Sequence, residues 1–136
     1  MKRTAEKVEH SGRVMAIVLR KGLEIEGIKF FTPDSYPFQL GVMVHEAGGE
    51  IKPHVHKPAR RVINETQEMI RVDFGKVDVD FYTDDGEKVR TVRLSEGDTI
   101  LFVSGGHGFR FPEKARMTEV KQGPYGGKDE DKMVFA

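Results

Sequence analysis

Residues 77–94 read VDVDFYTDDGEKVRTVRL, and this stretch decides the fold class. Its first part, Val77–Tyr82, begins with strict alternation of apolar and polar residues, which is the pattern of a half-buried strand. Its last part, Val89–Leu94, is a second strand-like run, and Asp85-Gly86 between them favours a tight hairpin turn. The stretch therefore predicts two antiparallel strands.

Similar short apolar runs recur along the chain between turns rich in Gly, Pro and Asp. No segment offers three capped helical turns, and the best helical candidate, Pro58–Thr66, is short and follows directly on a loop. Short strands at this spacing indicate an all-β sandwich or barrel. The predicted strands are residues 14–19, 27–31, 38–46, 67–72, 76–83, 88–94, 99–103, 109–111 and 117–121.

The chain has 136 residues, which suits one domain with a core of its own. We predict a single domain over residues 1–136, with the core at about 14–122, an N-terminal arm at 1–12 and a polar tail at 126–136. Asn occurs once and Gln three times among many charged residues, which is a tendency of thermophile proteins.

Composition also excludes several classes of function. The chain has no Cys, so disulfide frameworks, cysteine zinc sites, iron–sulfur clusters and thiol nucleophiles are ruled out. Its 22 basic and 22 acidic residues leave no net charge, which argues against nucleic acid as a partner. Apolar runs are too short to span a membrane, and no secretory leader is recognisable, so we expect a cytoplasmic protein.

Three of the five His residues form the most informative pattern. His54 and His56 are two positions apart, so on a strand both imidazoles leave the same face, as two ligands of one cation would. His107 follows the glycine-rich turn Gly105-Gly106 and is the candidate for a third ligand. The alternative for His54 and His56 is that they are surface histidines in a proline-rich loop. The alternative for His107 is that it caps the Gly105-Gly106 turn.

A carboxylate completes this candidate metal site. In the strand after residue 65, Glu68 shares a face with Ile70 and Val72, and an inward carboxylate is costly unless it is paired or bound to metal. The alternative is that Glu68 points outward and forms an ion pair with Arg71 or Lys76. Three His and one Glu suit Mn, Fe, Co, Ni or Zn.

With these motifs, residues 38–121 resemble a small single-domain cupin. Gly48, five residues and His54-Val55-His56 are similar to the start of the family's first motif, and Glu68, six residues and Gly75 to its end. Gly97 to His107 is similar to the second motif. The chain departs from the family's first motif in the eleven-residue spacer between His56 and Glu68, residues 57–67. It departs from the second motif in Val103, where the family has Pro, and in a gap between Gly105 and His107 that is one residue shorter.

The resemblance implies a double-stranded β-helix, or jelly-roll, barrel with His54, His56, Glu68 and His107 in one mouth. It also implies a homodimer, in whose interface Met69 and Arg71 are candidates. The long spacer leaves Glu65 and Gln67 as alternative fourth ligands.

Four further residues are candidates for binding a substrate. Gln39 and His45 share one face of the predicted strand 38–46 and would line the cavity, although a satisfied histidine at a sheet end is an equal alternative for His45. Arg60 and Arg61 lie in the spacer, where a guanidinium would clamp a carboxylate or phosphate, or would simply be solvated. Lys121, Gln122 and Tyr125 could also reach the cavity.

Our leading hypothesis is a small-molecule metalloenzyme, an isomerase or dioxygenase acting on an oxygen-donor substrate such as a sugar derivative, an enediol or a hydroxy or keto acid. The alternative is a non-catalytic barrel that binds or senses a sugar or small acid. A third is a structural role in which the His pair is fortuitous, because one fold hosts many functions.

Overall fold

The computed structural model describes residues 4–135, so Met1–Arg3 of the predicted N-terminal arm and Ala136 of the tail lie outside the described residues. The described chain is mostly β, as the alternation predicts. Its elements are β1 (Glu6–His10), β2 (Arg13–Leu19), β3 (Ile28–Phe30), β4 (Gly41–Met43), β5 (Glu68–Phe74), β6 (Lys76–Tyr82), β7 (Lys88–Ser95), β8 (Thr99–Phe102), β9 (Gly106–Arg110), β10 (Arg116–Lys121) and α1 (Lys128–Asp131). None of its helices is long and apolar enough to cross a membrane.

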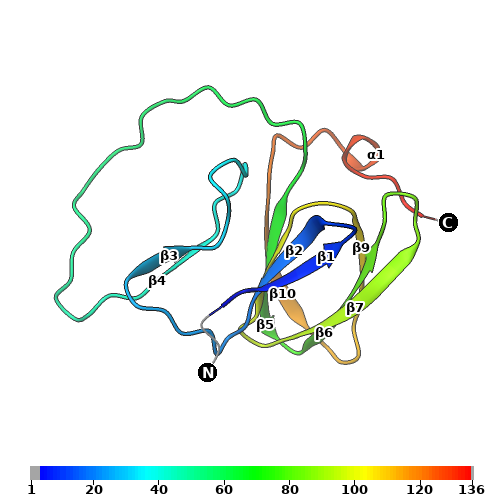
Figure 1. The fold of residues 1–136 in the computed structure, drawn as a ribbon, viewed down its shortest axis with the longest axis horizontal. Helices are drawn as coiled ribbons and strands as arrows, with labels where there is room; N and C mark the ends of the chain where they lie inside the picture. Colours follow the sequence, from blue (N-terminus) through cyan, green and yellow to red (C-terminus); the bar gives the residue numbers. More distant parts are fainter. Residues whose placement is uncertain (1–3, 136) are drawn as a thin grey trace.

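The strands form two facing sheets and a separate hairpin. One sheet has the order β1-β2-β8-β5-β10, the other has the order β7-β6-β9, and all pairs are antiparallel. Figure 1 shows these two sheets gathered on one side of the molecule, with the β3–β4 hairpin and a long loop on the other. Residues 20–67 join β2 to β5 and form the β2–β5 connection.

The core lies between the two sheets and follows the period-two pattern. Val77, Val79 and Phe81 of β6 are completely buried, and Val79 pairs with Val92 across the predicted hairpin. From the other sheet, alternate residues of β2, β5 and β8 point toward them. The cluster comprises Val8, Met15, Ala16, Val18, Ile70, Val72, Val77, Val79, Phe81, Val92, Leu94, Ile100 and Phe102.

The outer face of the larger sheet is also buried. Ile17 and Leu101 pair with one another, are 1% and 0% exposed, and alternate with core residues along their strands, so they point away from the core. Val42 of β4 shares a pocket with Leu19 and Thr99 of this face. We infer that the β3–β4 hairpin covers this side of the sheet.

Acidic and basic side chains form a ladder on the outer face of the smaller sheet. Arg93 of β7 donates to Asp78 at 2.7 and 2.9 Å, and Arg110 of β9 donates to Asp80 at 2.7 and 2.9 Å. The guanidinium groups lower the pKa of both carboxyls, because they stabilise the charged form. The ladder thus ties β6 to both of its neighbours.

One local prediction for the connection is wrong, because the strand expected over residues 38–46 is reduced to Gly41–Met43. Pro58–Thr66, the best helical candidate in a sequence without capped helical turns, forms no helix. Residues 44–66 have no neighbouring strand, and an isolated run of this length has too little packing to hold a regular structure in water. The connection therefore leaves the sandwich as an extended loop (Figure 1).

The two sheets are not joined along the side of the sandwich where β9 and β10 lie. Within residues 4–135, β9 pairs only with β6 and β10 pairs only with β5, so each strand ends its sheet. The all-β class is confirmed, while the sheets do not close into the barrel that the resemblance implies.

Candidate metal and ligand site

Glu68 and His107 come together between the two sheets. Glu68 begins β5 and His107 is the second residue of β9, and Nε2 of His107 lies 2.7 Å from Oε1 of Glu68. The contact therefore spans the interior from one sheet to the other. Two of the four predicted metal ligands are thus neighbours, and Glu68 points inward as its alternation with Ile70 and Val72 predicts.

Aromatic packing fixes the orientation of the His107 ring. The ring stacks on Phe102 at a centroid distance of 3.9 Å and an angle of 19°, and it meets the edge of Phe109 at 5.5 Å. Phe102 lies opposite Glu68 in the register of β8 and β5. This packing directs Nε2 toward the carboxylate and leaves the imidazole about a quarter exposed, at 24%.

β10 adds a second carboxylate and an amine to the same wall. Lys121 pairs with Glu68, and Glu119 pairs with Ile70, so both side chains share the inner face of the sheet. Burial alone would raise the pKa of Glu68, but hydrogen bonds with His107 and Glu119 outweigh it and lower that pKa below its ordinary value. The same hydrogen bond to Glu68 raises the pKa of Glu119, and burial adds to the effect. The two carboxyls therefore share one proton more readily than they ionise together.

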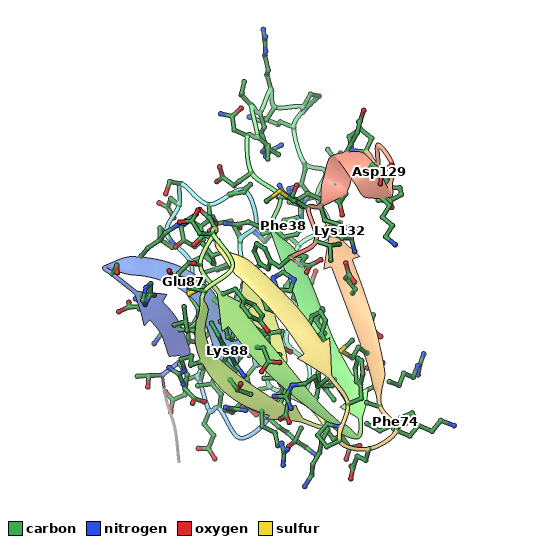
Figure 2. The ribbon with its side chains drawn as sticks, turned by 90° about the vertical axis from the view of Figure 1, so that its right-hand side faces the viewer. Phe38, Phe74, Glu87, Lys88, Asp129 and Lys132 are labelled. Carbon is green, nitrogen blue, oxygen red and sulfur yellow. The ribbon has the colours of Figure 1, made fainter. Side chains whose placement is uncertain are left out.

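The C-terminal segment lies over this end of the sandwich. Asp131 of α1 accepts a hydrogen bond from Nζ of Lys121 at 3.1 Å, and the ring of Phe135 lies 5.7 Å from that of Tyr82 at the end of β6. Figure 2 shows α1 just beyond the end of β10. The tail, expected to be a polar and solvated end, instead crosses from β10 to β6 beside the Glu68–His107 pair.

The other two predicted ligands lie elsewhere. His54 and His56 are exposed residues of the β2–β5 connection with no strand around them, and their rings meet edge to face at 5.2 Å. His54 Nδ1 lies 2.8 Å from the carbonyl oxygen of Lys52. Among residues 4–135, no three His, Asp or Glu side chains are arranged to hold a metal ion. A single chain in this conformation thus assembles half of the expected ligand set.

The alternative ligands, Glu65 and Gln67, lie just before β5. Glu65 is exposed, whereas Gln67 is 1% exposed and its Oε1 is buried with no hydrogen-bond partner in the described part of the chain. The backbone of Gln67 is held by Gln122, whose Oε1 accepts from its N–H at 2.7 Å. This pair anchors the end of the connection beside β10.

The predicted substrate-binding residues all belong to the connection and do not reach the Glu68–His107 pair. The Gln39 amide donates to the carbonyls of Pro33 and Tyr36 at 2.8 and 2.9 Å, so it closes a turn. Arg61 lines a pocket together with Gln39, while His45 and Arg60 are exposed.

Sequence reasoning missed Glu119 and named Lys121 only as one of three residues that could reach the cavity. A signal was present, because alternation in the run 117–121 places Met117, Glu119 and Lys121 on one face. The charged members of that face gave no indication that it points inward. The register with β5 settles the direction, because Met117 lies opposite the core residue Val72.

The molecule is thus an open antiparallel sandwich with a carboxylate–imidazole pair at one end. Comparisons with protein-family models, with curated proteins and with solved structures find no match to this chain.

Proposed function

We propose that this chain is a divalent-metal-binding protein of the cupin type and a small-molecule metalloenzyme, an isomerase or dioxygenase for an oxygen-donor substrate. The observation that carries the proposal is the 2.7 Å approach of His107 Nε2 to Glu68 Oε1 on the inner wall. An imidazole held by stacking beside a partly buried carboxylate is a donor set suited to a first-row cation. The cofactor is a divalent Mn, Fe, Ni, Co or Zn ion.

The fit of the metal to the single chain is partial. Glu68 and His107 would supply two ligands, and the remaining two, His54 and His56, are on the connection, away from the wall. A bound divalent ion would act as a Lewis acid toward an oxygen donor of the substrate. Glu68 and Glu119 share the inner face of β5 and β10, and a cation bound there would offset their negative charges.

Other residues of the wall suit a small anionic substrate. Lys121 Nζ lies 3.1 Å from the Asp131 carboxylate, and a hydroxy or keto acid offers the same group. Phe102 and Phe109 both pack against the imidazole and cover part of it with apolar surface, which limits water around it. The amine would orient the ligand, and the stacked ring would hold His107 in place.

The second candidate is a non-catalytic protein that binds or senses a small acid. The Lys121–Asp131 contact favours this candidate as well, because it is carboxylate recognition without chemistry. Turnover separates the two functions. A dioxygenase consumes oxygen with a diketone or enediol, an isomerase converts its substrate without oxygen, and a binder does neither.

Metal analysis tests the proposal. We expect about one equivalent of a first-row ion in the purified protein, or after addition of Mn, Fe, Co, Ni or Zn to the stripped protein. His107→Ala and Glu68→Gln should each weaken metal binding roughly 10-fold or more. His10→Ala, at an exposed histidine of β1, is the matched control and should bind metal normally. Less than about a tenth of an equivalent after all additions would refute a metal site.

A further inference from the structure

The open side of the sandwich has two unpaired strand edges. Among the described residues, β9 and β10 each have a neighbour on one edge only, so the other edge offers free backbone N–H and C=O groups. Both strands also carry residues of the wall, since His107 is on β9 and Glu119 and Lys121 are on β10. A strand added at this opening would lie against the Glu68–His107 pair.

The β2–β5 connection has the composition of such a strand. Ile51, Pro53 and Val55 alternate with Lys52, His54 and His56, which is the pattern of a strand with one apolar face. Val55 is 87% exposed and Ile51 is 54% exposed, so this face has no cover in the single chain. The opposite face of the same run carries both imidazoles.

Charge also matches the segment to the opening. Residues 50–61 contain four Lys and Arg and one Glu. On this wall Lys121 Nζ lies 3.1 Å from the Asp131 carboxylate and 3.9 Å from the Glu119 carboxylate, and Lys121 pairs with Glu68 in the register of the strands. A basic segment with two imidazoles therefore complements a wall on which three carboxylates lie around one amine.

The path of the chain indicates that the added strand comes from a second copy. We infer above that the β3–β4 hairpin covers the outer face of its own larger sheet, because Val42 lines one pocket with Leu19 and Thr99, and that face is opposite to the wall with Glu68. From β4 the chain runs away from its own sandwich before it returns at Gln67 (Figure 1). Two copies related by twofold symmetry could each receive the segment of the other, which makes a closed dimer.

We propose that residues 51–56 of a second copy add as a strand to the free edge of β9, so that its His54 and His56 face Glu68 and His107. The metal site is then composite, with two ligands from each of two chains. The placement of the imidazoles rests on the proposed metal function, whereas the added strand does not. This exchange supplies the neighbour that β9 lacks in the single chain, and it places Val55 on the outer face of the sheet, the face on which Gly108 lies.

Cross-linking tests the added strand. Because the chain has no cysteine, single substitutions give unambiguous disulfides. Val55→Cys places a thiol on the segment, and Gly108→Cys places one in the middle of β9, where a Cβ meets nothing closer than 3.9 Å. We expect a Val55→Cys chain, mixed with a Gly108→Cys chain of different mass, to form a disulfide-linked heterodimer.

Arg90→Cys is the matched control, because it is exposed on β7, the other end strand of the same sheet. It should not cross-link to Val55→Cys. Sedimentation of the wild-type protein should give a dimer. A wild-type monomer at the highest soluble concentration would overturn the proposal. So would a Val55→Cys/Gly108→Cys chain that forms its disulfide only within one molecule.

Hybrid dimers test the composite site. One chain carries His54→Ala and His56→Ala, the other carries Glu68→Gln and His107→Ala, and neither should bind metal alone. When the two variants are refolded together, one of the two sites in each heterodimer is intact. Metal binding should therefore return to about half of an equivalent per chain in the heterodimers. If the wild type binds metal and the cross-linked heterodimers do not recover metal binding, the shared site is overturned. Cross-linking in a wild type that binds no metal would refute the proposed function and leave the added strand supported.

Discussion

Arg110 and Asp80 form a two-point ion pair that attaches β9 to the sandwich. Nε and Nη2 of Arg110 donate to the two carboxylate oxygens at 2.7 and 2.9 Å, and Thr91 of β7 donates to the same carboxylate from the other side. One aspartate thus connects all three strands of the smaller sheet. Since β9 has a single neighbour within residues 4–135, this pair supports the strand that carries His107.

Asp80→Asn should lower Tm at pH 7 by a few degrees, because the amide cannot accept from both Arg110 and Thr91 as a carboxylate does. The pKa of Asp80 is held below its ordinary 3.8, so its ionised form favours the folded state above that pH. This stabilisation is lost as the pH falls through the lowered pKa. Thermal melts at pH 7 and pH 3 should therefore show a smaller difference between wild type and variant at pH 3.

Asp84→Asn is the control, since the ion pair of Asp84 with Arg13 is largely exposed, with side chains 67% and 56% accessible. It should leave Tm nearly unchanged at both pH values. An equal Tm for Asp80→Asn and wild type at pH 7 would contradict a stabilising role for the ladder.

Glu119→Gln should stabilise the protein at neutral pH. The contact with Glu68 raises the pKa of Glu119, so the folded state prefers the protonated form, and that preference costs stability as the pH rises through the raised pKa. Gln stays neutral and can still donate to Glu68. The gain should stay within about 1 kcal/mol, because the Glu119 side chain is 43% exposed and water screens the repulsion.

Urea unfolding at pH 4 and pH 8 measures this effect, and the advantage of Glu119→Gln should be larger at pH 8. Glu113→Gln, in the exposed turn before β10, should show no such trend. A variant that is less stable than wild type at pH 8 would be inconsistent with a shared proton.

Leu101→Ala should cost about 2–5 kcal/mol, the range of a core truncation, although Leu101 points away from the main core. The reason is its complete burial beneath the outer cover of the larger sheet. Val120→Ala is the matched control, because Val120 lies opposite Met69 on the same outer face and is 49% exposed. Its cost should be about 0.5 kcal/mol. Equal costs in urea unfolding would mean that the hairpin does not cover this face.

Trypsin should cut the native protein first after Arg60 or Arg61. Both side chains are exposed in a loop without regular structure, and exposed loops are the preferred sites of proteolytic cleavage. Cleavage after Lys57 is blocked by Pro58. Mass spectrometry of early time points identifies the site, and first cleavage within β6 or β7 would contradict the exposure of the connection.

Sequence alone predicts those parts of the molecule in which local pattern and tertiary packing agree. The hairpin of residues 77–94 follows from alternation and from the Asp85-Gly86 turn, where Gly86 adopts a φ of 88°. Glu68 is placed inward by its two apolar neighbours on the same face. These signals lie within a few residues of one another, so no knowledge of distant segments is needed.

The connection is where sequence reasoning goes wrong. The alternation of residues 38–46 is as regular as that of β6, yet only Gly41–Met43 pair, because a strand forms only where another strand offers its edge. The position of Glu119 also depends on a distant strand, since its register with β5 decides which face points inward. Pairing partners far apart along the chain are the information that local patterns lack.

The contact between Lys121 and Asp131 has a consequence for any anion that reaches this end of the sandwich. The chain already presents a carboxylate to the amine, and because it is tethered ten residues away, its effective concentration is high. An incoming acid must displace this internal competitor before it can bind. The tail therefore sets an affinity threshold, and weak or scarce acids would leave Lys121 occupied by its own protein.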